Sequence, residues 1–158
     1  EAKERIGDWE GDTVIGKNHQ GAIVTLVDRR SRYFLAAPLA SKHATGVTEA
    51  IKTLLEPHKD RCHTITFDNG KEFAEHDIIA AHLDVSIYFA NPYHSWERGV
   101  NENTNGLLRQ YFPKGMSLSN YSQAKLNAVA RQLNERPRKT LNYQTPAERF
   151  AQSVASTG

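Results

Sequence analysis

Runs of apolar and β-branched residues, bounded by turn-forming residues, recur through the first 90 positions of the chain. Such runs predict β-strands, and we place them at residues 8–15, 22–27, 32–38, 63–67 and 85–89. The turn-rich stretch 16–21 joins the first two and predicts a β-hairpin. Apolar residues at helical spacing predict helices at about 45–55, 71–83 and 122–135. Three successive strands, then strands alternating with helices, indicate an α/β fold with a mixed five-stranded sheet flanked by helices.

Two further helices are predicted in the second half of the chain. Val100, Leu107, Leu108 and Tyr111 recur at i, i+7, i+8 and i+11 and form one apolar stripe. At about 100° per residue, Glu102 lies nearly opposite that stripe. The sequence Thr-Pro-Ala-Glu at 145–148 predicts a helix start, because it offers an N-cap Thr, a Pro at N1 and the Glu of a capping box.

Composition suits one soluble domain. A length of 158 residues is enough for a single core, so we treat residues 1–158 as one domain. The chain has no run of 18 apolar residues and no signal-peptide pattern, so we expect a cytoplasmic protein without a membrane segment. Cys62 is the single cysteine, which excludes an intrachain disulfide and a cysteine zinc cluster. We expect it to be a small buried residue.

The net charge of +2 does not by itself indicate nucleic-acid binding. Its distribution is more informative, because the first strand is acidic and basic residues gather in the carboxyl half of the chain. A site that binds metal ions through carboxylates and a polyanion through its rim would have this pattern. For Lys125 and Lys139, a solvated helix face is the better interpretation.

Three carboxylates occupy three different local settings. Asp12 lies inside the first predicted strand, Asp68 ends the fourth strand just before Asn-Gly, and Glu102 lies on the predicted helix. The carboxyl end of a strand is where open α/β sheets place their ligands. Clustered carboxylates repel one another unless a cation intervenes, and their hard oxygen atoms suit magnesium or manganese.

Each acid taken singly also has a structural explanation. Asp12 could belong to a solvated strand edge with Asp8 and Glu10, which share its face by the period of two. Asp68 could accept hydrogen bonds in an Asx turn. Glu102 could form an exposed i, i+4 ion pair with the arginine at position 98, a contact of about 0.3–0.5 kcal/mol.

Taken together, three motifs resemble those of the integrase and DDE transposase superfamily. They are Trp-Glu-Gly-Asp-Thr at 9–13, Asp-Asn-Gly-Lys-Glu-Phe at 68–73, and the run 91–102 that ends in Asn-Glu. The 33 residues between Asp68 and Glu102 fit the spacing of that superfamily. The runs 7–16 and 97–109 are more closely similar to transposases of the insertion sequence thirty family, and the resemblance covers residues 7–150.

The resemblance implies a ribonuclease H-like fold with Asp12, Asp68 and Glu102 as catalytic residues and metal ligands. Two Mg²⁺ or Mn²⁺ ions would then support in-line displacement at phosphorus. Water would nick DNA at the ends of a mobile element, and the freed 3′-hydroxyl would attack target DNA. The implied partners are element-end and target DNA and further copies of the chain in the active complex, working at the bacterial nucleoid.

Several residues near the third acid are candidates for DNA contact. Arg98, Asn105 and Arg109 share its helical face, and the resemblance favours a phosphate contact for Arg109. For Asn105, orienting the acid and touching DNA remain equal alternatives. His94 lies in a predicted loop beside Tyr93 and Trp96, whose aromatic rings could stack on a splayed base. Core burial is an equal alternative for the tryptophan.

Other acids compete for the same roles and are set aside. Glu97 lies at the predicted start of the helix, where the helix dipole explains a carboxylate. Asp28 ends the second strand before a predicted turn, and turn capping is its better interpretation. We expect Trp9 to be a core residue. The histidines show no metal-binding pair, so no zinc site is predicted.

Two other functions remain as alternatives. A non-catalytic DNA- or protein-binding module could use the same fold, although the intact acid triad argues against it. A phosphatase or glycosidase built on Asp8 and Glu10 has no supporting motif. Because the chain begins at Glu1 and its single Met is Met116, we expect a fragment that lacks a preceding helix-turn-helix region.

Overall fold

The computed structural model describes residues 5–39, 43–68, 70–90, 104 and 106–157. Five strands form one sheet in the order β3-β2-β1-β4-β5. Their bounds are β1 Asp8–Ile15, β2 Ala22–Asp28, β3 Phe34–Leu39, β4 Thr64–Phe67 and β5 Ser86–Phe89. The β1–β2 and β2–β3 pairs are antiparallel, whereas β1–β4 and β4–β5 are parallel. The predicted mixed five-stranded sheet is therefore confirmed.

The largest difference from the predicted strands is at the start of β3, predicted from residue 32 and found from Phe34. Arg32 has a φ of 67°, in the left-handed region that interrupts a strand. Its N–H donates to the carbonyl of Asp28 at 2.8 Å. Arg32 therefore belongs to the turn between β2 and β3, and the strand begins beyond it.

The predicted helices at 45–55 and 122–135 correspond to α1 Ala44–Leu55 and α4 Gln123–Asn134. The predicted capping box is present at the start of α5 Pro146–Thr157. There Glu148 Oε1 accepts from Thr145 N–H at 2.8 Å, and Thr145 Oγ1 accepts from Glu148 N–H at 3.0 Å. Two reciprocal bonds fix the first turn of this helix.

The predicted helix at 71–83 is wrong in its first turns. Residues Lys71–Phe73 form a separate 3₁₀ turn, and the α-helix α2 runs only over His76–Leu83. The ring of Phe73 stacks on Phe67 with 4.1 Å between centroids. This contact holds the turn against the end of β4, apart from α2.

The predicted helix around residue 102 is described only in part. Thr104 and residues 106–108 are helical, and Leu108 of the predicted apolar stripe is buried. The beginning of this helix, with Glu102, lies outside the described residues.

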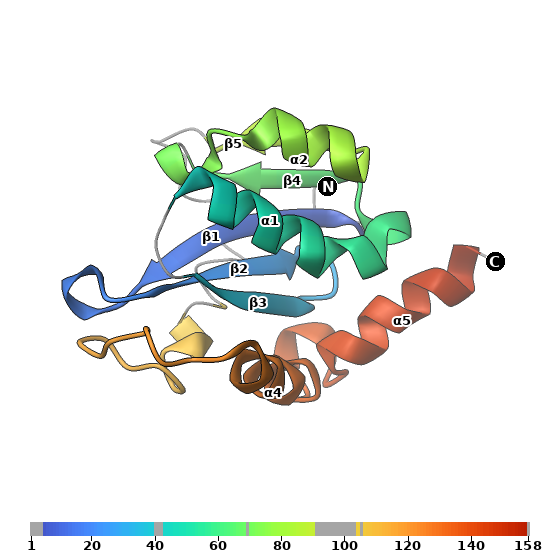
Figure 1. Cartoon of the computed structure of the whole chain (residues 1–158). Helices are drawn as coiled ribbons and strands as arrows, with labels where there is room; N and C mark the ends of the chain where they lie inside the picture. Colours follow the sequence, from blue (N-terminus) through green and yellow to red (C-terminus); the bar gives the residue numbers. More distant parts are fainter. Residues whose placement is uncertain (1–4, 40–42, 69, 91–103, 105, 158) are drawn as a thin grey trace.

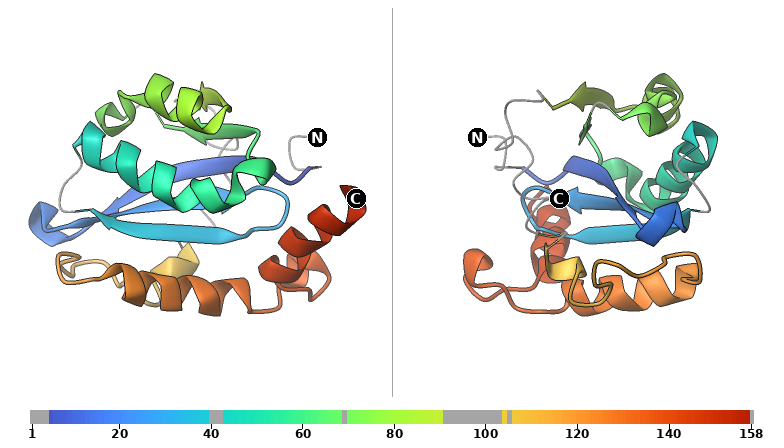
Figure 2. Two further views of the ribbon diagram at one scale, coloured as in Figure 1. Left: turned by 45° about the vertical axis from the view of Figure 1, so that its right-hand side comes forward. Right: turned by 90° about the vertical axis from the view of Figure 1, so that its left-hand side faces the viewer.

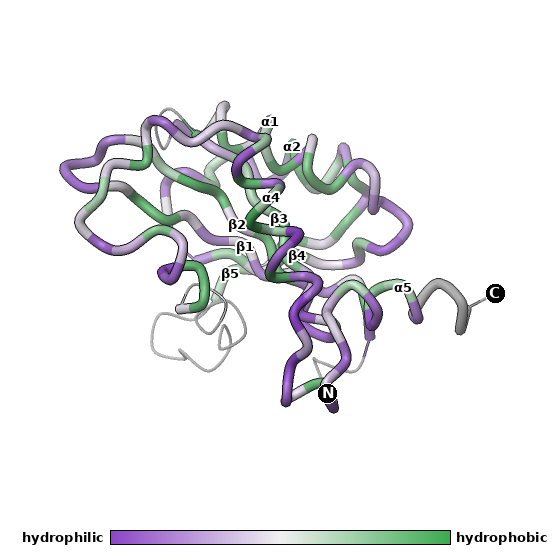
Figure 3. The backbone as a smooth tube through the Cα atoms, turned by 90° about the horizontal axis from the view of Figure 1, so that it is seen from below, coloured by the Kyte–Doolittle hydropathy of each residue, from purple (hydrophilic) through white to green (hydrophobic). Residues whose placement is uncertain are grey.

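Helices cover both faces of the sheet. Figures 1 and 2 show α1 and α2 on one side and α4 on the other. In Figure 3 the apolar positions gather along the central strands and the packed helices, and hydrophilic positions mark the peripheral loops. Among the described residues, no helix combines the length and apolar character needed to cross a lipid bilayer.

Alternation along the strands divides the side chains between the two faces. The face toward α1 and α2 is apolar along the sheet and includes Trp9, Val24, Leu26, Ala37, Ile65 and Phe67. Trp9 is fully buried there, as predicted. The face toward α4 is apolar mainly over β2 and β3, where Ile23, Val27, Phe34 and Ala36 pack with Leu126, Val129 and Leu133 of α4.

The remainder of the α4 face is polar. Strand register and alternation place on it Asp8, Glu10 and Asp12 of β1, Thr64 and Thr66 of β4, and Ser86 and Tyr88 of β5. We call these residues the polar half of the α4 face. Helix α4 packs on the apolar part of this face, over β2 and β3. The acids of the polar half lie beside that contact.

Asn134, at the end of α4, closes the edge of the sheet at β3. Its Oδ1 accepts from the N–H of Phe34 at 2.8 Å, and its Nδ2 donates to the carbonyl of Phe34 at 2.9 Å. Asn134 is 5% exposed, so both backbone groups are satisfied away from water. An edge strand has unpaired groups of this kind, and here a side-chain amide substitutes for a neighbouring strand.

Replacing Asn134 with Ala should lower the free energy of unfolding by about 2–3 kcal/mol, because two buried backbone groups lose their partner. Urea unfolding followed by circular dichroism measures the loss. The matched control is Asn127→Ala on the exposed side of the same helix, where the amide oxygen accepts from Gln123 at 2.8 Å. Equal losses of stability in the two variants would contradict a stabilising role for the two Asn134–Phe34 hydrogen bonds.

Candidate active site

The parallel pairing of β1 with β4 relates Asp12 to Asp68. Glu10 lies opposite Thr66 in the register. Two residues further along each strand direction are Asp12 and Asp68, so these acids occupy equivalent positions of neighbouring chain segments. Both acids thus lie two residues beyond the last paired residues of neighbouring strands, Asp12 on the polar half of the α4 face and Asp68 just after the end of β4. Neighbouring strands lie about 4.8 Å apart, so this register predicts that the two carboxylates lie close together.

Asp12 is half-buried on an interior strand. Its Oδ1 accepts a hydrogen bond from the N–H of Thr13 at 2.8 Å. β1 pairs with β2 along its length and with β4 over Asp8–Glu10, so a solvated edge is wrong for that first part of the strand. Asp12 pairs with Thr25 of β2 and lies beyond the residues paired with β4, so its own place on or off the edge stays a prediction. Asp8 and Glu10, the other members of that proposed edge, are buried at 8% and 1% exposure.

Asp68 is half-buried at the end of β4. Its Oδ1 accepts from the N–H of Gly70 at 2.9 Å, so the Asx turn suggested as its structural explanation is present. A carboxylate has two oxygen atoms and about four lone-pair sites. The turn occupies one of them, and a metal-binding role is compatible with it.

A close approach of backbone and ring aligns the two acid-bearing segments. A Cβ at Gly11 would lie 2.4 Å from Cε1 and 2.7 Å from Cδ1 of Phe67. Phe67 directly precedes Asp68, and its ring is sandwiched between β1 and the ring of Phe73. Glycine before Asp12 therefore lets β4 bring Asp68 alongside β1.

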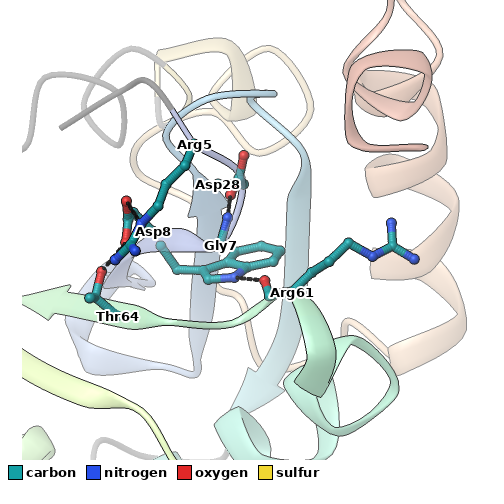
Figure 4. Close-up of polar contacts among 7 residues, drawn as sticks. Arg5, Gly7, Asp8, Asp28, Arg61 and Thr64 are labelled. Atoms are coloured by element: carbon teal, nitrogen blue, oxygen red, sulfur yellow. Dashed lines mark hydrogen bonds and ion pairs between the residues drawn. The ribbon is translucent and has the colours of Figure 1, made fainter. Parts of the chain in front are cut away.

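Neighbouring acids are held in other contacts. Asp8 binds Arg5 at 2.9 and 3.0 Å and accepts from the Thr64 hydroxyl at 2.7 Å, as Figure 4 shows. Glu10 binds Arg29 at 2.9 Å. These pairings give both carboxylates a structural role at the start of β1, which agrees with the lack of a motif for a hydrolase built on them.

Asp28 has the predicted turn-capping role. One of its oxygens accepts from the N–H and hydroxyl of Ser31, both at 2.8 Å. The other accepts from the N–H of Gly7 at 2.8 Å, also drawn in Figure 4. The residue is fully buried and connects the β2–β3 turn to the segment before β1.

Burial and hydrogen bonding shift the pKa values of several groups near the start of β1. Burial alone would raise the pKa of Asp8, but bonds from Arg5 and Thr64 outweigh it and hold that pKa below its ordinary value. Burial raises the pKa of Asp28 despite its bonds to Gly7 and Ser31. Burial also raises the pKa of the Cys62 thiol to about 12, so this cysteine is the small buried residue predicted.

Most of the remaining predicted site residues lie outside the described residues: Glu102, His94, Arg98, Asn105 and the competing Glu97. Arg109 is described, half-buried in a turn just past the last helical residue, and its Nη1 donates to the carbonyl of Phe112 at 3.2 Å. Within the described ranges, no group of three His, Cys, Asp or Glu side chains could hold a metal ion. Of the three predicted acids, only Asp12 and Asp68 lie within the described residues, and the three-acid site stays a prediction.

Sequence reasoning missed three residues next to the acids: Gly11, Thr13 and Glu72. Glu72 is 6% exposed, and its Oε2 accepts from the Thr13 hydroxyl at 3.0 Å. The available signal was the place of Glu72 within the motif 68–73, directly before the apolar Phe73, where the sequence predicted the first turn of a helix.

Solved structures share this fold. The chain resembles the structure titled "Crystal structure of catalytic core domain of BIV integrase in crystal form I" with a TM-score of 0.70 and 20% identity, covering 95% of this chain and 97% of that one. A simian T-cell lymphotropic virus intasome chain gives a TM-score of 0.73 at 21% identity, over 92% of this chain and 54% of that one. These matches confirm the ribonuclease H-like fold.

The integrase core domain model matches residues 2–95. The chain therefore belongs to the integrase core domain family. It is 51% identical, over 98% of its length, to the transposase for insertion sequence element IS4351 of Bacteroides fragilis. It is 45% identical, again over 98%, to the transposase InsI for insertion sequence element IS30A of Escherichia coli strain K12. These relatives confirm the likeness to transposases of the insertion sequence thirty family.

The chain spans less than half the length of the curated relatives it matches. It covers 47% of the Bacteroides fragilis transposase and 40% of the Escherichia coli one. The similarity is thus between this chain and one part of those proteins.

Adding a methyl group at Gly11 tests the close approach of β1 to Phe67. Gly11→Ala should lower the free energy of unfolding by about 1–3 kcal/mol, because the Phe67 ring and the segment after it must shift. Gly46→Ala is the control, since a Cβ there meets nothing within 4 Å. Because alanine favours the helix, that substitution should raise the free energy of unfolding by about 0.5–1 kcal/mol. Chemical denaturation of both variants gives the comparison, and a stabilised Gly11→Ala variant would contradict the packing.

The lowered pKa of Asp8 predicts a pH-dependent contribution to stability. Since folding favours its ionised form, Asp8 stabilises the protein above the unfolded pKa of about 3.9, and the contribution is lost as the pH falls through the folded pKa. The stability difference between wild type and Asp8→Asn should therefore be larger at neutral pH than in acid. Arg5→Gln should show the same trend. A difference that stays constant with pH in unfolding titrations would contradict the assignment.

Proposed function

We propose that this chain is the catalytic domain of a DDE transposase, which cuts DNA at the ends of an insertion sequence and joins them to target DNA. The observation that carries the proposal is the parallel register of β1 and β4, which relates the positions of Asp12 and Asp68. Family membership and the transposase relatives support the same reaction.

In this proposal Asp12, Asp68 and Glu102 are the catalytic carboxylates and hold two Mg²⁺ or Mn²⁺ ions. The donor set fits such ions, because carboxylate oxygens are the hard ligands that they prefer. When bound, the ions would activate the attacking oxygen and stabilise the leaving oxygen at phosphorus. The protein's own contribution is to fix the carboxylates, through the Thr13 N–H at Asp12 and the Gly70 N–H at Asp68.

DNA is the proposed substrate, both as element ends and as target. His94, Arg98, Asn105 and Arg109 are the proposed contacts around the third acid. Arg109 uses one of its five N–H donors on the carbonyl of Phe112, and an arginine anchored in this way can still direct other donors to a phosphate. Joining two ends requires more than one copy of the chain, so we propose a homo-oligomer in the working complex, acting at the bacterial nucleoid.

We further propose that residues 1–158 act as a single catalytic core. The alternative is a non-catalytic binding module with the same fold. A module of that kind would have no need for Asp12 and Asp68 in register, so their retention favours the enzyme.

Neutralising each acid separately tests the proposal. We expect Asp12→Asn, Asp68→Asn and Glu102→Gln each to weaken Mn²⁺ binding in calorimetry and to reduce metal-dependent nicking of supercoiled DNA by at least about 100-fold. Both assays should include duplex DNA, so that a site completed by DNA is also detected. Binding of DNA itself should remain, because the phosphate contacts are untouched.

Asp84→Asn is the matched control. Asp84 is an exposed carboxylate at the end of α2 with a φ of 56°, a conformation that Asn also tolerates. Its metal binding and nicking should equal those of wild type. Metal binding that survives all three neutralisations would overturn the acid assignment and favour the binding module.

A further inference from the structure

Glu72 is a buried carboxylate between the two acid-bearing segments. It is 6% exposed and lies on the 3₁₀ turn Lys71–Phe73, four residues after Asp68. A buried carboxylate costs free energy unless hydrogen bonds compensate for lost hydration. A carboxylate buried at this place points to a role that an apolar residue could not fill.

The first contact of Glu72 is with the strand that carries Asp12. Glu72 Oε2 accepts from the hydroxyl of Thr13 at 3.0 Å. The backbone N–H of the same Thr13 donates to Asp12 Oδ1 at 2.8 Å. The hydrogen bond that restrains the Thr13 side chain therefore also restrains the carboxylate of Asp12, through the Thr13 N–H.

The second contact of Glu72 is with the turn that holds Asp68. A Cβ at Gly70 would lie 2.4 Å from Glu72 Oε1 and 2.6 Å from its Cδ, so the carboxylate packs directly against the glycine. The N–H of Gly70 donates to Asp68 Oδ1 at 2.9 Å. The path from Asp12 through Thr13, Glu72 and Gly70 to Asp68 is continuous.

We propose that Glu72 is a positioning residue that sets the separation and orientation of Asp12 and Asp68. The inference rests on the proposed function for its effect on catalysis, but the positioning itself is a property of the chain. A carboxylate suits this role, because it accepts a hydrogen bond from the Thr13 hydroxyl and its planar group fits against Gly70. The role depends on an oxygen acceptor at this place and not on the negative charge.

Three substitutions separate positioning from other roles. Glu72→Gln keeps an oxygen acceptor for Thr13, Glu72→Ala removes it, and Thr13→Val removes the donor at nearly constant shape. The control is Glu49→Ala, which removes an exposed carboxylate on α1 that pairs only weakly with Lys52 at 3.3 Å.

The first readout is hydrogen exchange at the amides of Thr13 and Gly70 in the metal-free protein. Glu72→Ala and Thr13→Val should speed exchange at these amides by about tenfold or more, with amides elsewhere in β1 and β4 unchanged. Glu72→Gln should leave exchange near the wild-type rate. Hydrogen exchange does not depend on catalytic activity, so this measurement tests the positioning role separately from the proposed function.

The second readout is single-turnover DNA cleavage with Mn²⁺, below the melting temperature of every variant. A small displacement of catalytic groups costs about 10- to 100-fold in rate, and we expect this loss for Glu72→Ala and Thr13→Val, with unchanged DNA affinity. Glu72→Gln should stay within about threefold of wild type. The double variant Thr13→Val/Glu72→Ala should be no slower than Glu72→Ala alone, because the bond that Thr13→Val removes is already absent when Glu72 is alanine.

Two outcomes would overturn the inference. If Glu72→Ala exchanges and cleaves as wild type does, Glu72 has no positioning role, and the proposed function is unaffected. If Glu72→Gln is as slow as Glu72→Ala, the charge matters and Glu72 acts as a ligand. Failure of the proposed function has a different signature, in which Asp12→Asn and Asp68→Asn leave metal-dependent cleavage intact.

Discussion

The parallel pairing of β1 with β4 is the interaction on which the rest of the structure depends. It joins segments more than 50 residues apart and relates Asp12 to Asp68 through the register of Glu10 with Thr66. The pairing requires the missing side chain at Gly11, because the Phe67 ring occupies that space. This pairing thus joins the two parts of the sheet and sets the relative register of the two acids.

The division of the α4 face explains how a sheet can be well packed and still carry a polar site. Over β2 and β3 the face is apolar and binds α4. Over β1 and β4 it carries acids and threonines, and the deepest acids, Asp8 and Glu10, are paired with Arg5 and Arg29. Burying a charge is tolerable when it is paired and hydrogen-bonded, so these arginines permit an acidic strand in the interior of the sheet.

Local patterns predicted the strands and most of the helices because alternation and helical spacing are properties of short segments. The turn-capping role of Asp28 followed from the same local logic, since Ser31 is three residues away. The strand-edge alternative was wrong for Asp8 and Glu10, because the second neighbour of β1 comes from residues 64–66, which no local pattern relates to it. The role of Glu72 depends on Thr13, 59 residues earlier, and is equally non-local.

The order of the strands also has a consequence for how the protein folds. β1, β2 and β3 form a meander of sequence-adjacent hairpins, and contacts between near neighbours form quickly because little loop entropy is lost. The β1–β4 pairing must wait for α1 and the long connection that precedes β4. Asp12 therefore lies on the part of the sheet that forms from local contacts, whereas Asp68 is brought to it by a pairing between distant segments. A chain still emerging from the ribosome would have Asp12 on its strand before Asp68 is near it, and the pair would form only after β4 has joined β1.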